Sequence, residues 1–167
     1  GEIKSIKSNR IKELLEVLEE TDGKVIIWAV YRYDIQQIEK TLGEKYGKES
    51  VATYYGDTKD NIRQSVVDRF MDSNDPLRFF VGNPKTGGYG LTLTSSHTVV
   101  YYSNDYSLEV RLQSEDRAHR IGQTSKVTYV DLITDHTIDE KIVKALNNKI
   151  DLASQVMGED PKKILFS

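Results

Sequence analysis

The chain has 167 residues, of which 38% are hydrophobic and 29% charged, a balance that suits one globular domain and excludes a disordered tail. Its 23 basic and 26 acidic residues give a net charge of −3, which excludes a generally basic nucleic-acid coat but leaves room for a local basic site. The chain has no cysteine and no apolar run of about 18 residues, so no disulfide, thiol nucleophile, zinc finger or membrane span is expected.

Helix and strand patterns alternate along the chain. The first pattern is helical, with leucines at helical spacing, an N-cap at Ser8 and a stop at Asp22-Gly23. An apolar run from Val25 to Val30 follows and predicts a strand that is buried on both faces. Further strands are predicted at residues 51–54, 77–81, 98–102 and 127–133. Further helices are predicted around residues 35–42, 62–70 and 112–121, and from the capping box at 137–140 onward.

Strands that alternate with helices favour a mostly parallel sheet, so we predict a three-layer α/β domain with helices on both faces of the sheet. In such sheets ligands bind beyond the carboxyl ends of the strands. Tyrosines gather at three of these predicted ends, and two explanations are open: half-buried rings with solvated hydroxyls, or the aromatic rim of a binding site. The tyrosines are Tyr31 and Tyr33, Tyr54 and Tyr55, and Tyr101 and Tyr102.

The segment 113–123 carries the strongest chemical signal and reads Gln-Ser-Glu-Asp-Arg-Ala-His-Arg-Ile-Gly-Gln. Arg117 and Arg120 stand three residues apart, so on a helix both guanidinium groups lie on one face. Two forked, permanently charged donors on one face suit an anionic phosphate chain. The alternative is a solvated helix in which Arg117 pairs with Glu115, Asp116 or another carboxylate.

This segment resembles motif VI of the Swi/Snf-like DNA translocases, a branch of the DEAD-box-related helicase superfamily. The stretch 86–94, Thr-Gly-Gly-Tyr-Gly-Leu-Thr-Leu-Thr, is similar to the family's motif V. Further matches are residues 8–15 with the family's leading helix, 24–30 with the motif IV strand, and 55–58 with its Gly-x-Thr segment, followed by Arg63 and Phe70. The resemblance covers most of residues 8–145 in the family's order.

Two positions depart from the family pattern. Thr92 stands where the family usually has Asn, and Tyr106-Ser107-Leu108 stands where it usually has Trp-Asn-Pro. These departures indicate a divergent branch rather than a typical chromatin remodeller.

The resemblance implies a RecA-like second motor lobe over residues 23–135, with a leading helix over 1–22 packed on it and a C-terminal helix and tail over 136–167. In the family, two such lobes hold ATP and Mg²⁺ between them and move along duplex DNA. The first lobe carries the phosphate-binding loop and the acidic box. We therefore expect this chain to be inactive alone, to hold no tightly bound cofactor, and to have that N-terminal lobe and DNA as partners.

The resemblance also assigns roles to single residues. Arg117 and Arg120 are implied to be arginine fingers, the catalytic groups that reach the γ-phosphate, with Gly90 and Gln113 beside them at the nucleotide. Contacts to the duplex backbone, independent of base sequence, are implied for the loops after the first three strands. These DNA-binding residues are Arg32, Gly56, Thr58, Thr86, Gly87 and Gly88.

The sequence lacks the marks of a complete ATPase site. The stretch 43–49, Gly-Glu-Lys-Tyr-Gly-Lys-Glu, is too short for a Walker A loop and lacks its hydroxyl, and no apolar strand precedes Asp139-Glu140. The three histidines are scattered, so no metal site is expected. Two hypotheses for the function therefore remain: a motor lobe, or a non-catalytic RecA-like module that binds nucleic acid or protein. We expect the protein in the cytoplasm or, depending on the source, at the nucleoid or in the nucleus.

Overall fold

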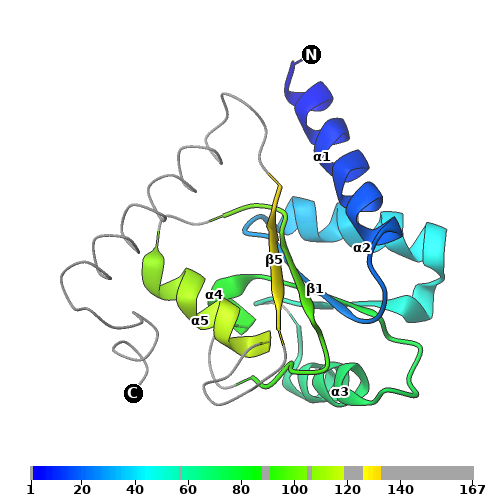
Figure 1. The fold of residues 1–167 in the computed structure, drawn as a ribbon, viewed down its shortest axis with the longest axis vertical. Helices are drawn as coiled ribbons and strands as arrows, with labels where there is room; N and C mark the ends of the chain where they lie inside the picture. Colours follow the sequence, from blue (N-terminus) through cyan, green and yellow to red (C-terminus); the bar gives the residue numbers. More distant parts are fainter. Residues whose placement is uncertain (1, 57, 88–90, 105–106, 119–125, 133–167) are drawn as a thin grey trace.

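A parallel five-stranded sheet forms the centre of the computed structural model, which describes residues 2–56, 58–87, 91–104, 107–118 and 126–132 (Figure 1). The strands are β1 (Val25–Trp28), β2 (Val51–Tyr54), β3 (Phe79–Gly82), β4 (Thr98–Tyr101) and β5 (Thr128–Asp131). They pair in parallel in the order β2-β3-β1-β4-β5. The helices are α1 (Glu2–Glu19), α2 (Arg32–Tyr46), α3 (Asp60–Met71), α4 (Pro84–Gly87) and α5 (Leu108–Ala118), with a 3₁₀ turn, η1, at Lys48–Ser50.

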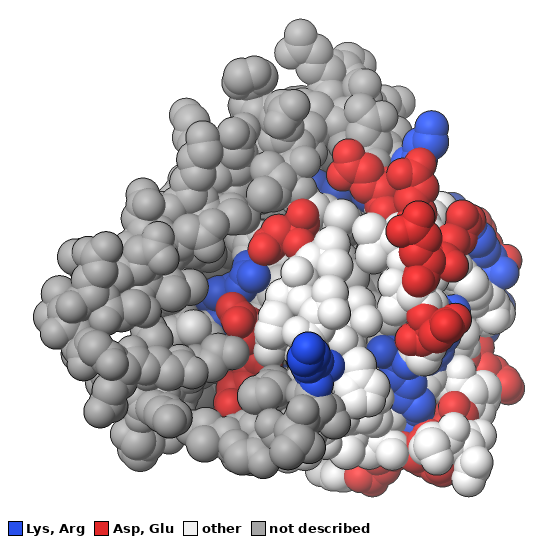
Figure 2. Space-filling model, viewed as in Figure 1, with Lys and Arg blue, Asp and Glu red and all other residues white. Residues whose placement is uncertain are grey.

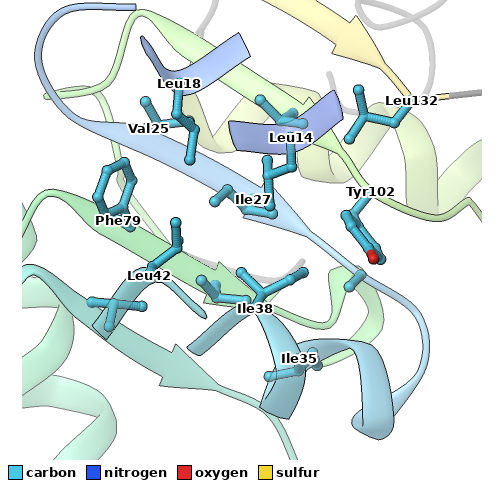
Figure 3. Packing of buried hydrophobic residues seen from close by; sticks show 14 residues of the cluster. Leu14, Leu18, Val25, Ile27, Ile35, Ile38, Leu42, Phe79, Tyr102 and Leu132 are labelled. Atoms are coloured by element: carbon cyan, nitrogen blue, oxygen red, sulfur yellow. The ribbon is translucent and has the colours of Figure 1, made fainter. Parts of the chain in front are cut away.

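One face of the sheet is covered by α1 and α2 (Figure 3). Leu14 and Leu18 of α1 and Ile38 of α2 are buried against Val25 and Ile27, which are two of the four fully buried residues of β1. Hydrophobic burial is worth about 1.5–3 kcal/mol for each such side chain, so this layer holds α1 and α2 against the sheet. All four residues of β1 are buried, which confirms the prediction of a strand buried on both faces, although the strand ends at Trp28 rather than at Val30.

The opposite face is covered by α3 and α5 and is rich in aromatic rings. Trp28 and Phe80 lie edge to face with ring centroids 5.8 Å apart, and Phe70 of α3 packs on Phe80 at 5.6 Å. Val66 of α3 and Ala118 of α5 complete this cluster. Helices on both faces of a parallel sheet make the three-layer α/β domain that the alternating pattern predicts. No helix in the described part of the chain is long and apolar enough to cross a membrane.

The starts of two helices differ from the sequence prediction. Ser8 is not an N-cap, because α1 begins at Glu2; the first residues contain good helix formers and neither glycine nor proline after Gly1. Helix α5 begins at Leu108 rather than near Leu112. The N–H of Val110 donates to the Ser107 hydroxyl at 3.3 Å, so Ser107 is the cap from which the helix starts.

The tyrosines at the strand ends divide into three groups. Tyr54, Tyr101 and Tyr102 are buried in the cores, so neither half-buried rings nor an aromatic rim describes them. Tyr31 and Tyr33 flank the start of α2 and are 55% and 57% exposed. Tyr55 is half-buried, as the first explanation foresaw, and its ring faces the Arg32 guanidinium.

Gly82 is the position where the sheet tolerates a side chain least. A Cβ there would lie 2.8 Å from the Tyr54 carbonyl oxygen and 3.2 Å from the rings of Phe80 and Trp28. Gly82→Ala is expected to lower the free energy of unfolding by about 1–3 kcal/mol, because a packed core cannot make room for the methyl group. Urea unfolding followed by the fluorescence of Trp28, the only tryptophan, measures this.

The matched control is Gly43→Ala in α2, where the nearest atoms lie 3.9 Å away and alanine raises helix propensity. This variant is expected to be as stable as the parent or up to about 1 kcal/mol more stable. Equal stability of the two variants would contradict the close packing at Gly82.

Candidate functional site

The loops after β1, β2 and β3 lie at one edge of the sheet, since all strands run parallel. Arg32, the first residue of α2, is exposed, and its guanidinium lies 5.7 Å from the centre of the Tyr55 ring, directly after β2. This contact joins the first two loops. These two predicted DNA-binding loops are therefore neighbours in space as well as in topology.

The second loop is a closed turn. The Thr58 N–H donates to the Tyr55 carbonyl at 2.9 Å, and the Tyr55 N–H donates back to the Thr58 hydroxyl at 3.2 Å. Arg63 of α3 donates to the carbonyls of Tyr55 and Gly56, at 3.1 and 3.0 Å. Thr58 thus shapes the turn with its side chain, while Gly56 is exposed at its tip.

The third predicted loop, after β3, begins with a short helix. Thr86 and Gly87 belong to α4, and the N–H of Lys85 donates to the Asn83 side-chain oxygen at 2.8 Å. Asparagine as a cap followed by proline is a helix-start signal, and the glycines after it obscured this signal in the sequence. The prediction of an open loop at Thr86 and Gly87 is corrected, and Gly88 lies outside the described residues.

Asn83 is a residue that the sequence patterns did not single out. Its side-chain N–H donates to the Val30 carbonyl after β1 at 3.0 Å, and its backbone N–H donates to the Tyr54 carbonyl at the end of β2 at 3.1 Å. With its cap of α4, the residue ties together the ends of β1, β2 and β3. Two of these three bonds are long-range contacts, which short-range sequence patterns do not reveal.

The second group of predicted site residues lies on α5. Arg117 is 7% exposed; its Nε donates to the Gln113 carbonyl at 2.9 Å, and its Nη2 lies 3.2 Å from the Asp116 carboxylate. Arg117 thus forms an ion pair with Asp116, as the alternative of a solvated helix predicts, but its side chain is buried rather than solvated. The Gln113 Nε2 donates to Glu109 at 3.3 Å, while its buried Oε1 has no hydrogen-bond partner among the described residues.

The two groups meet through α4 and the segment that follows it. Helix α4 packs against α5, and the N–H of Leu93 donates to the Arg117 carbonyl at 2.8 Å. The stretch that resembles motif V is therefore bonded to the helix that resembles motif VI. Gly90 and Arg120, the two other residues predicted at the nucleotide, lie outside the described residues.

Arg111 holds α5 on the sheet. It donates to both carboxylate oxygens of Asp131 on β5, at 2.7 and 3.1 Å, and to Glu115 at 2.9 Å, and its guanidinium lies 3.5 Å from the centre of the Tyr101 ring. Burial raises the pKa of the Tyr101 hydroxyl well above its usual value, against the opposing charge of Arg111. The hydroxyl therefore stays neutral and lies 2.7 Å from the Ser114 hydroxyl.

Residues 7–122 match the family model described as the helicase conserved C-terminal domain. The chain is 33% identical over 156 residues to ATP-dependent helicase fft2 of Schizosaccharomyces pombe, and the alignment covers 92% of this chain and 12% of that protein. It is 31% identical over 161 residues to ATP-dependent helicase FUN30 of Saccharomyces cerevisiae, and this alignment covers 96% of the chain and 14% of that protein. The chain thus spans a small part of the relatives that it matches.

A solved structure is also similar to this chain. The crystal structure of the C-terminal part of the Fun30 ATPase domain aligns with a TM-score of 0.71 and 30% sequence identity. The alignment covers 95% of this chain and 51% of that chain. Similarity in sequence and in fold therefore extends over nearly the whole length of this chain.

Proposed function

The chain belongs to the helicase C-terminal domain family of the Swi/Snf-like ATPases and has their RecA-like fold, and on that premise we propose that it is the second motor lobe of an ATP-dependent DNA translocase. The observation that carries the proposal is the bond between Leu93 and Arg117, which joins the motif V and motif VI segments. Such a junction is what a lobe needs if DNA contact and ATP hydrolysis are to influence each other.

At the nucleotide, we assign Arg117 and Arg120 as arginine fingers. ATP supplies the phosphoryl group whose negative charge these side chains stabilise during transfer. Arg117 of α5 is a buried cation, which suits a phosphate chain, while the Gln113 side-chain oxygen, without a partner among the described residues, is an acceptor that suits a hydroxyl, amino or water donor beside it. Gly90 completes the proposed nucleotide contacts, and the other lobe is the proposed holder of Mg²⁺.

At the DNA, we assign the edge formed by the loops after β1, β2 and β3. The proposed contacts are one cation, hydroxyls and glycine backbone, which suit phosphate groups and read no base. On the face seen in Figure 2, acidic side chains gather over the region of α1 and α2 and basic ones are scattered. We therefore expect weak binding of DNA by this lobe alone, with a shallow dependence on salt. The proposed residues are Arg32, Gly56, Thr58, Thr86, Gly87 and Gly88.

The rival function is a non-catalytic RecA-like module that binds nucleic acid or protein. The bond between Leu93 and Arg117 favours the motor lobe, because a simple binding module has no need to couple the motif V and motif VI segments. The name of one similar protein, Protein CHROMATIN REMODELING 19 of Arabidopsis thaliana, favours the nucleus among the expected locations.

The 167-residue chain alone is expected to hydrolyse no ATP, with or without duplex DNA. The physical reason is that fingers accelerate phosphoryl transfer only when a phosphate loop and a metal-binding carboxylate hold the nucleotide in line. The full-length protein is expected to hydrolyse ATP faster when duplex DNA is added, and to lose this turnover when residues 1–167 are deleted. Phosphate release from the three proteins, with and without DNA, measures it.

DNA-stimulated ATP turnover by the pure 167-residue chain would contradict the proposal that the other lobe supplies the phosphate-binding loop and the metal-binding carboxylate. Undiminished turnover after its deletion would instead favour the non-catalytic module.

A further inference from the structure

Three consecutive residues at the start of α2 are exposed. They are Tyr31, Arg32 and Tyr33, and the two tyrosines are 55% and 57% exposed. Every other aromatic side chain in the described part of the chain is buried or half-buried. A partner that covered these two rings would remove apolar surface from water, which is favourable. The proposed DNA contacts include Arg32 and leave both rings unassigned.

The backbone under the two rings is held in place on both sides. The Val30 N–H donates to the Ser103 hydroxyl at 2.8 Å, and the Val30 carbonyl accepts a hydrogen bond from the Asn83 side chain at 3.0 Å. The Tyr31 carbonyl accepts the Ile35 N–H at 3.1 Å, because Tyr31 is the N-cap residue of α2. The rings thus stand on a backbone that is already ordered, and a ligand does not have to order it on binding.

The charge between the two rings is positive. Arg32 is exposed, whereas Asp34, in the same turn of α2, is 4% exposed. After β2, the exposed carboxylate of Asp60 lies 3.7 Å from the Arg63 guanidinium, which offsets its charge, and Asp57 lies outside the described residues. A ligand at the start of α2 therefore meets one cation between two aromatic rings.

This order of groups matches one strand of a DNA duplex. Each phosphate of the strand stands between two sugars, whose C–H groups offer apolar surface, while neighbouring bases cover the faces of the bases. A single cation releases few counterions, so it supplies little affinity. Contact between a ring and a sugar removes apolar surface from water and adds affinity that does not depend on counterion release.

We propose that Tyr31 and Tyr33 pack on the sugars of one strand of duplex DNA while Arg32 pairs with the phosphate between them. The inference rests on the proposed function of this edge and adds to it a source of affinity besides charge. Contacts to sugar and phosphate read no base, so the affinity is the same for every base sequence. A protein surface with acidic and apolar groups is the competing occupant, and it enters the test as an outcome.

The test measures the Kd of the full-length protein for a fluorescent DNA duplex at several salt concentrations. Tyr31→Ala and Tyr33→Ala are each expected to raise the Kd about tenfold, the effect of burying about 50 Å² of ring surface, and to leave the slope of log Kd against log salt unchanged. Arg32→Ala is expected to reduce that slope by about 0.9, because one phosphate loses its cation. Phenylalanine at either tyrosine position keeps the ring and is expected to bind within about twofold of the parent.

The matched control is Met71→Ala, an exposed apolar residue at the far end of α3, which is expected to bind DNA like the parent. Thermal unfolding checks the fold of each variant. Parent-like binding of duplex DNA by both tyrosine-to-alanine variants would overturn the inference in favour of a protein contact and leave the proposed function intact. A loss seen only with single-stranded DNA would overturn it in favour of stacking on unpaired bases. Failure of the parent to bind duplex DNA would overturn the proposed function itself, and the inference with it.

Discussion

Arg117→Ala in the full-length protein is expected to lower ATP turnover by a factor of about 10³–10⁵, the contribution of an arginine finger in related NTPases. The proposed role confines its strongest contact to the transition state, so the affinity for ATP is expected to change far less than the rate. Arg120→Ala is expected to behave in the same way. Single-turnover kinetics together with equilibrium ATP binding separate the two effects.

Two control variants isolate the guanidinium itself. Asp116→Asn removes the charged partner at 3.2 Å and leaves Arg117 in place, so turnover is expected to stay near that of the parent. Arg117→Lys keeps the positive charge without the planar fork and is expected to restore only part of the rate. Thermal unfolding of each variant is needed, because Arg117 is buried and bonded to Gln113. Near-normal turnover of both alanine variants would contradict the assignment of arginine fingers and leave Arg117 with a structural role only, in its ion pair with Asp116.

Arg111→Ala is expected to lower the free energy of unfolding by about 3–5 kcal/mol, the range for breaking a buried ion pair by removing one partner. The Arg111 side chain is 12% exposed, and its loss leaves the carboxylates of Asp131 and Glu115 without their cation. Helix α5 would also lose its attachment to β5. Urea unfolding of the 167-residue chain, followed by Trp28 fluorescence, measures the change.

The control for Arg111 is the double variant Arg111→Met, Asp131→Asn. This double variant removes the Asp131 carboxylate, which would otherwise be left without its cation, and it keeps much of the apolar volume of Arg111. It is therefore expected to recover part of the stability that is lost in Arg111→Met alone. Additive losses from Arg111→Met and Asp131→Asn would contradict the coupling.

The sequence predicted the sheet well because its strongest signals are local. The uninterrupted apolar run of β1 could satisfy its side chains only by burial on both faces, and the alternation with helices then required parallel strands. The starts of α4 and α5 were missed although Asn83 and Ser107 are local caps. In both places nearby glycines or polar residues weaken the periodic pattern on which the prediction depended.

The spatial arrangement of the proposed site residues follows only in part from the sequence. The parallel topology alone was enough to place Arg32, Gly56 and Thr86 at one edge. The ion pair of Arg111 with Asp131 joins residues far apart in the chain, and a single sequence carries no sign of it because each residue would look equally natural on a solvated surface.

The bonds of Asn83 have a mechanical consequence. One amide side chain and its backbone link the ends of three strands, so a load applied at one loop is shared with the other two. We therefore expect the ends of these three strands to move together rather than independently. If this edge grips a DNA backbone, as proposed, a pull along the duplex passes into the whole sheet and is not absorbed by the bending of one loop.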